Sequence, residues 1–267
     1  MDRLPPARID AYLDRIGADR PAAPTVEALH DLHLRHLRTI PFENLSIHLG
    51  EDLSLDDEAL LAKIVDARRG GFCYELNGGF ALLLAALGYE VELLQGRVHG
   101  RDGRPGIPYD HLALRITTPD GRRWLADVGF GDHSHHPLAF DDHEDQKDPG
   151  GTFRMVPTQD GDLDVLKDGT PRYRLELRPR VLPDFTAGAW WHRTSPTSPF
   201  TQSPLCSLLT PDGRITVSGR RLITTVDGER TETDLTDDAE LLAAYRTHFG
   251  VRLTRVPVPL HPPRPKD

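Results

Sequence analysis

Residues 69–77 read Arg-Gly-Gly-Phe-Cys-Tyr-Glu-Leu-Asn, and this stretch joins two segments that both have helical periodicity. Its two glycines end the first helix, so Cys73 falls in the first turn of the next one. A thiol there faces unpaired backbone N–H groups and the positive end of the helix dipole, which both favour the thiolate. Cys73 is therefore a candidate nucleophile. The alternative is that it packs as a small buried hydrophobic residue.

Apolar residues on both sides of this stretch recur at the spacing of amphipathic helices. The predicted helices cover residues 9–16, 25–37, 54–69 and 73–87. Ser54 and Asp57 have the spacing of a capping box at the start of the third helix. A glycine follows the first, third and fourth helices, where it favours termination. The first ninety residues are therefore expected to form a helical segment.

Beyond Gly88 the pattern changes to short apolar segments separated by turn sequences. The predicted strands cover residues 91–98, 111–116, 123–128, 172–178, 214–217 and 220–226. Residues 132–151 carry few core-forming side chains, and we expect a long exposed loop there. A last helix is predicted from Asp237 to Phe249. The proline-rich tail, residues 256–267, excludes regular helix and central strand.

Two of these strands flank the sequence Pro119-Asp120-Gly121, which is typical of a type I turn followed by a bulge. This turn pairs positions whose numbers sum to 240, so His111 faces Gly129 and Asp127 lies diagonally on the same face. A carboxylate in this apolar strand is costly to bury without a partner. The hairpin therefore predicts a contact between His111 and Asp127. That contact is either a plain structural hydrogen bond or an oriented base for Cys73.

Composition excludes several classes of protein. The chain has 267 residues and a formal net charge of −9, whereas sequence-independent nucleic-acid binding needs a cationic face. Its first 17 residues lack the apolar core of a secretory signal, and the longest nearly apolar run, residues 80–89, is half a membrane span. Cys206 is expected to be buried, because two distant cysteines make no disulfide framework. We expect a cytoplasmic protein without nucleic-acid or membrane partners.

Other histidines are weaker candidates for a base or a metal ligand. The second predicted helix carries His30, His33 and His36, and we expect these histidines to pack or to be partly buried. A second group lies in the predicted loop, where no carboxylate has a convincing ligand spacing; it consists of His133, His135 and His136. We predict no metal, and a metal-loading protein stays as an alternative.

Several motifs resemble one known family, the arylamine N-acetyltransferases. The stretch of residues 69–77 resembles the active-site motif of that family, and residues 36–45, His-Leu-Arg-Thr-Ile-Pro-Phe-Glu-Asn-Leu, resemble the segment ahead of it. His111 in DHLALRI, Asp127 in LADVGFG and the sequence Ser198-Pro-Phe-Thr follow in the order and spacing of the family. The resemblance covers nearly the whole chain.

This resemblance implies an α+β fold in three parts. Residues 1–88 would be a helical domain carrying the nucleophile, residues 89–190 a β-barrel domain carrying the His and Asp, and residues 191–267 an α/β lid.

The resemblance also implies a ping-pong acetyltransferase with acetyl-CoA as donor and Cys73, His111 and Asp127 as the catalytic residues. The acceptor would be an aromatic amine, hydrazine or N-hydroxyarylamine, consistent with xenobiotic metabolism. The expected contact residues are Phe42, Phe130 and Phe200 for the amine, and Gly129 and Gly131 for CoA. Whether the chain forms a homo-oligomer stays open.

Two alternatives keep the same Cys-His-Asp chemistry. An amide synthase would release a carrier-bound acyl chain onto an amine. A thiol hydrolase of the papain or transglutaminase type would use water or lysine as acceptor, although the residues around Cys73 differ from papain-like signatures.

Overall fold

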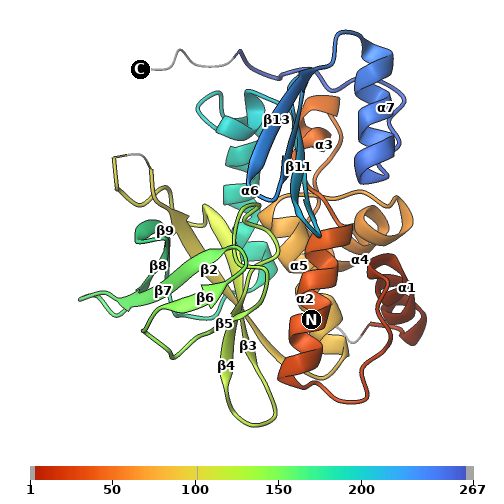
Figure 1. The fold of residues 1–267 in the computed structure, drawn as a ribbon. Helices are drawn as coiled ribbons and strands as arrows, with labels where there is room; N and C mark the ends of the chain where they lie inside the picture. Colours follow the sequence, from red (N-terminus) through yellow and green to blue (C-terminus); the bar gives the residue numbers. More distant parts are fainter. Residues whose placement is uncertain (1–3, 101, 263–267) are drawn as a thin grey trace.

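The computed structural model describes residues 4–100 and 102–262, so residues 1–3 and the last five residues of the proline-rich tail lie outside it. The fold is α+β, as predicted (Figure 1). Helices form one part, an eight-stranded barrel-like sheet forms the second, and a five-stranded sheet with a covering helix forms the third. No helix among the described residues is long and apolar enough to cross a membrane.

The helices agree with the predicted ones in most places. Their bounds are α1 Pro6–Ile16, α2 Val26–Thr39, α3 Leu45–Leu49, α4 Asp57–Leu61, α5 Cys73–Ala86, α6 Thr186–Thr194 and α7 Asp238–Phe249. Short helices of other types are η1 Ala62–Asp66, η2 Leu182–Phe185 and η3 Pro199–Thr201. Thr25 caps α2 by accepting the N–H of Ala28, and Gly17 ends α1 in the left-handed conformation.

The third predicted helix differs in its start and its geometry. Ser54 does not form a capping box, because its hydroxyl bonds to the carboxylate of Asp56 and the helix begins at Asp57. From Ala62 the helix continues as the π-helix η1. The helices α3 and α6 were not predicted.

The eight-stranded sheet has the order β5-β4-β3-β2-β9-β8-β7-β6. Its strands are β2 Glu90–Val98, β3 His111–Thr117, β4 Arg123–Ala126, β5 Leu138–Ala139, β6 Gln146–Asp148, β7 Gly151–Pro157, β8 Leu163–Lys167 and β9 Thr170–Leu175. Every neighbouring pair is antiparallel. Helix α5 packs against β2 and β3, which brings its first turn near this sheet.

The predicted register of the β3–β4 hairpin is confirmed, since Leu114 pairs with Ala126 and Thr117 with Arg123. The ladder ends at Ala126, so the predicted pairing of His111 with Gly129 does not form. The backbone N–H groups of the next two residues donate to side chains instead of to β3. Asp127 donates to His33, and Val128 donates to Asn77.

The five-stranded sheet has the order β1-β10-β11-β12-β13. Its strands are β1 Phe42–Glu43, β10 Leu205–Thr210, β11 Gly213–Ser218, β12 Arg221–Val226 and β13 Glu229–Asp234. Strand β1 comes from the helical region, and Leu45 and Leu49 are buried in the same hydrophobic core as Cys206 and α7. The N-terminal segment thus contributes to the third part of the fold. The domain boundaries at residues 88 and 190 stay predictions.

The prediction of a long exposed loop at residues 132–151 was wrong. His133 and Ser134 are buried, and the segment contains β5 and β6. Leu138 and Phe140 insert into the core of the eight-stranded sheet. Asp148 accepts the backbone N–H groups of residues 135, 136 and 150, which replaces the hydrogen bonds that a longer strand would provide. Leu138, Phe140 and the Asp148 carboxylate thus anchor the segment, while residues 141–145 are exposed.

Two buried histidines make the fold sensitive to acid. Burial, only partly offset by nearby acceptors, lowers the pKa of His33 and of His133 to about 4. An unfolded histidine titrates near about 6.5, so below that pH the unfolded chain takes up protons that the folded chain does not. We expect each histidine to reduce the free energy of unfolding by about 2 kcal/mol between pH 7 and pH 5. Urea unfolding at both pH values measures the loss.

The variant His133→Asn removes one of the two titrating side chains and so tests this prediction. The difference in unfolding free energy between pH 7 and pH 5 should shrink by about 2 kcal/mol in the variant. An unchanged difference would contradict the assignment.

Candidate active site

Cys73 is the first residue of α5, as predicted. The backbone N–H of Phe72 donates to the carboxylate of Glu75 at 3.2 Å, and Lys63 lies 2.5 Å from the other oxygen of that carboxylate. The preceding turn is tight, because a Cβ atom on Gly70 would lie 1.9 Å from the carbonyl oxygen of Pro41. Only glycine fits there, and this close approach packs the loop before Cys73 against Pro41.

A buried ion pair holds the loop before Cys73. The guanidinium of Arg69 donates to both carboxylate oxygens of Glu43, at 2.8 and 3.2 Å. Glu43 also accepts the backbone N–H groups of Leu45 and Gly70. This carboxylate thus joins β1, the start of α3 and the loop before the thiol. Arg69 also pairs with Glu51 at 3.1 Å, whereas removing Arg69 would leave the fully buried Glu43 carboxylate without this cation, which is costly.

The predicted contact between His111 and Asp127 is confirmed. Nε2 of His111 lies 2.7 Å from a carboxylate oxygen of Asp127, and both side chains are almost fully buried. Burial lowers the pKa of His111, but the charge and hydrogen bond of Asp127, together with a hydrogen bond to Cys73, raise it to about 10. Burial alone would raise the pKa of Asp127, but the charge and hydrogen bond of His111 outweigh it, and the pKa is lowered. The pair therefore favours an imidazolium next to a carboxylate.

The Cys73 thiol completes this arrangement. Cys73 and His111 line the same cavity, and Cys73 contributes to the raised pKa of His111. Because Asp127 engages Nε2 of the ring, Nδ1 is the ring nitrogen left for sulfur. A Cβ atom on Gly129 would lie 2.7 Å from Cα of Cys73, so the turn after β4 touches the backbone of α5. Cys73 of α5, His111 of β3 and Asp127, which directly follows β4, are thus brought together.

Asn77 supports Asp127 from α5. Its side-chain amide donates to Asp127 at 2.9 Å and to the carbonyl oxygen of Leu112 at 2.6 Å, and its oxygen accepts the N–H of Val128. The backbone N–H of Gly129 is a further donor to Asp127. Asn77 lies within residues 69–77, one helical turn after Cys73. Its spacing from Cys73 could therefore have identified it as a neighbour of the thiol.

Other supports of Asp127 could not be found from local sequence. The hydroxyl of Tyr173, on β9, lies 3.3 Å from Nε2 of His133, and burial together with the nearby charge of Asp127 raises the pKa of Tyr173 well above its usual range. His33, on α2, accepts the backbone N–H of Asp127 at 3.2 Å, and its other nitrogen bonds to the carbonyl oxygen of His135. His33 therefore packs as predicted and also positions the backbone of Asp127.

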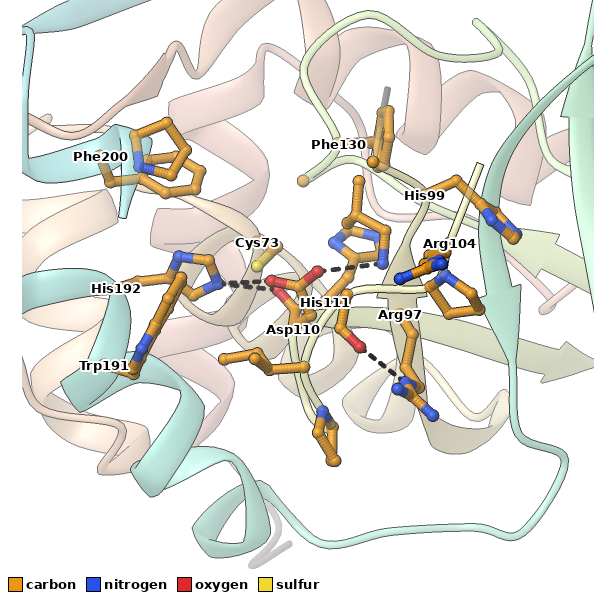
Figure 2. A pocket seen from close by; sticks show the side chains of 18 of the residues that line it. Cys73, Arg97, His99, Arg104, Asp110, His111, Phe130, Trp191, His192 and Phe200 are labelled. Carbon is orange, nitrogen blue, oxygen red and sulfur yellow. Dashed lines mark hydrogen bonds and ion pairs between the residues drawn. The ribbon is translucent and has the colours of Figure 1, made fainter. Parts of the chain in front are cut away.

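The thiol opens into a cavity of about 860 Å³ (Figure 2). His111 and Gly129 line it, and so do the three aromatic residues predicted for the acceptor, Phe42, Phe130 and Phe200. Gly131 is not among its lining residues, and a Cβ atom added there would lie 3.7 Å from the ring of Phe42. Trp191 and His192 of α6 also line the cavity, together with Asp110, which precedes β3.

The remaining predicted residues lie elsewhere. Among the residues described, no group of three His, Cys, Asp or Glu side chains could hold a metal ion. His133 bonds to Ser134 and Tyr173 rather than facing His135 and His136 as a ligand set. Cys206 is fully buried in the core of the third part of the fold, as predicted.

Comparison with known proteins gives consistent matches. The family model described as N-acetyltransferase matches residues 25–258. The arylamine N-acetyltransferase of Mycolicibacterium smegmatis is 36% identical over 256 residues, which are 92% of each chain. The structure of the Salmonella typhimurium enzyme of the same name has a TM-score of 0.85 at 31% identity, covering 92% of this chain and 91% of that one. The Mycobacterium marinum enzyme in complex with CoA has a TM-score of 0.83 at 32% identity, covering 91% and 92%. On these matches the chain belongs to the arylamine N-acetyltransferase family of acyltransferases.

Proposed function

We propose that this protein transfers an acetyl group from acetyl-CoA to an arylamine, hydrazine or N-hydroxyarylamine through an acetyl-Cys73 intermediate. The observation that carries the proposal is the contact of Cys73 with the buried His111–Asp127 pair at the base of an aromatic-lined cavity. The names of the relatives support the acceptor class, and the CoA complex of the M. marinum enzyme supports the donor.

In the first half-reaction the Cys73 sulfur attacks the thioester carbonyl, and His111 holds the proton of the thiol. The C–S bond to CoA breaks, His111 gives the proton to the leaving sulfur, and CoA leaves as the thiol while the acetyl group stays on Cys73. Asp127 fixes the orientation of the imidazole and stabilises its protonated form. Backbone N–H groups in the first turn of α5 would stabilise the tetrahedral oxyanion by about 3–4 kcal/mol.

In the second half-reaction the amine attacks the acetyl-Cys73 carbonyl. His111 takes a proton from the amine, the C–S bond breaks, and the amide leaves. The aromatic walls of the cavity exclude water, which protects the thioester from hydrolysis until an amine arrives. Phe42, Phe130 and Phe200 would contact the acceptor ring. Gly129 and Gly131 stay predictions as CoA contacts, as do the cytoplasmic location and the role in xenobiotic metabolism.

Mass spectrometry of the protein mixed with acetyl-CoA and no amine tests the intermediate. We expect a gain of one acetyl group on the peptide that contains Cys73. The variant Cys73→Ser should gain none and should lose acetyl transfer, because a hydroxyl is a far poorer nucleophile than a thiolate. No gain in the wild type, or transfer near wild-type rates in the variant, would reject the proposed mechanism.

Replacing Asp127 separates a catalytic from a structural role. We expect Asp127→Asn to leave the fold largely intact and to reduce turnover by about 10⁴-fold, as misorienting the base does in other triads. The measurement is turnover per folded molecule, with the folded fraction taken from thermal unfolding. A lower stability with unchanged turnover per folded molecule would indicate that Asp127 is only structural.

Alkylation compares the two cysteines within one molecule. Cys73 lines the cavity beside His111, whereas burial raises the pKa of the Cys206 thiol well above its usual range. We expect iodoacetamide to modify Cys73 quickly and Cys206 slowly, as followed by peptide mass spectrometry over time. Equally slow modification of both would show that the surroundings of Cys73 do not activate it.

A further inference from the structure

A second histidine–carboxylate pair lines the same cavity. Nε2 of His192, on α6, lies 3.0 Å from one carboxylate oxygen of Asp110 (Figure 2). The other carboxylate oxygen accepts the backbone N–H of Val98 at the end of β2, also at 3.0 Å. Asp110 directly precedes His111 in the chain. The mechanism above gives this pair no part.

The imidazole of His192 has no nitrogen left for a ligand. Its Nε2 faces two oxygens of Asp110, the carboxylate and the backbone carbonyl at 3.1 Å, so Nε2 carries the hydrogen and donates. Nδ1 lies 3.3 Å from the hydroxyl of Ser198. The ring also packs edge-on against Phe200, with centroids 4.9 Å apart. His192 therefore holds the carboxylate in place, and Asp110 is the member of the pair that can act on a ligand.

Asp110 has acceptor capacity left over. An ionised carboxylate offers about four lone-pair sites, and protein donors occupy one on each oxygen. Its side chain is 12% exposed, and Asp110 lines the cavity, so the exposed part is open to what the cavity contains. Phe130, Trp191 and Phe200 also line the cavity, and among its described lining residues the other carboxylate, Asp102, lies at the exposed edge with its side chain 63% exposed. A hydrogen-bond donor of a ligand gains more binding free energy from a carboxylate in this partly buried cavity than it would in water.

The cations near the cavity are engaged elsewhere. Arg97 donates from Nε to the carbonyl oxygen of Gly106 at 2.8 Å. Arg104 lies at the exposed edge, 3.9 Å from Asp102. Within residues 4–100 and 102–262, His192 is the side chain that pairs with the Asp110 carboxylate.

We propose that Asp110 is a specificity-determining residue of the acceptor cavity, and that it favours aromatic amines carrying a second hydrogen-bond donor, such as a ring hydroxyl or a second amino group. This inference rests on the proposed function, because it assigns a substrate class to the same cavity. The second hydrogen-bond donor of the aromatic amine binds the Asp110 carboxylate, while the reacting amino group attacks the acyl group on Cys73.

The test compares matched acceptors. The three aminophenol isomers are paired with the three methoxyanilines, which have similar electronic effects on the amine but no second donor. For each pair, the ratio of kcat/KM is measured with acetyl-CoA in the wild type and in Asp110→Asn. Because each ratio is compared between the wild type and the variant, differences between the two amines in intrinsic reactivity and size cancel. We expect the ratio for at least one isomer to fall by about tenfold or more in the variant, the usual effect of losing a hydrogen bond to a charged group.

Two further variants keep the test decisive. Asp102→Asn removes the carboxylate at the exposed edge, and its ratios should stay within about twofold of wild type. Where Asp110→Asn does not fold, Asp110→Glu retains the charge but moves it by one methylene, and the preferred isomer should change. Acetylation of Cys73 by acetyl-CoA alone verifies that each variant is competent in the first half-reaction.

The outcomes separate this inference from the proposed function. If the wild type acetylates none of the six amines and forms no acetyl-Cys73, the proposed function fails. If it acetylates them but the ratios are the same in the wild type and both Asp110 variants, only the role of Asp110 is overturned. An equal loss of preference in Asp102→Asn would also overturn it.

Discussion

The buried carboxylate of Asp127 is the constraint on which this site depends. A buried charge is tolerated only when donors surround it. Here His111, the Asn77 amide and the Gly129 N–H all donate to it. These donors come from β3, α5 and the turn after β4, so satisfying one carboxylate brings three parts of the chain together. The contact that orients the histidine is the same contact that joins helix to sheet.

Features set by local chemistry could be predicted from the sequence. The Pro119-Asp120-Gly121 turn determines the β3–β4 register, and that register brings His111 and Asp127 together. The glycines before Cys73 place it at the start of α5. The end of the β3–β4 ladder could not be predicted in this way. It is set by His33 and Asn77, which accept the backbone N–H groups of Asp127 and Val128 from far away in the sequence.

Features that depend on a few distant contacts were missed for the same reason. Residues 132–151 have a polar composition, yet Leu138 and Phe140 are buried in the core of the eight-stranded sheet. Tyr173 reaches Asp127 from β9, and nothing near it in the sequence indicates that role. Strand β1 has only two residues, too few to give an alternating pattern, and its partner β10 lies more than 160 residues further along.

Strand β1 has a consequence for how the molecule can move. Phe42 lines the cavity and pairs with Ser207 of β10, while Glu43 pairs with Cys206 and anchors Arg69. Strand β1 therefore connects the five-stranded sheet to the loop that precedes the thiol. A rigid rotation of the five-stranded sheet away from the barrel would displace an aromatic wall and strain the nucleophile loop together. Ligand entry is thus expected to use motions of side chains rather than hinge opening of this sheet.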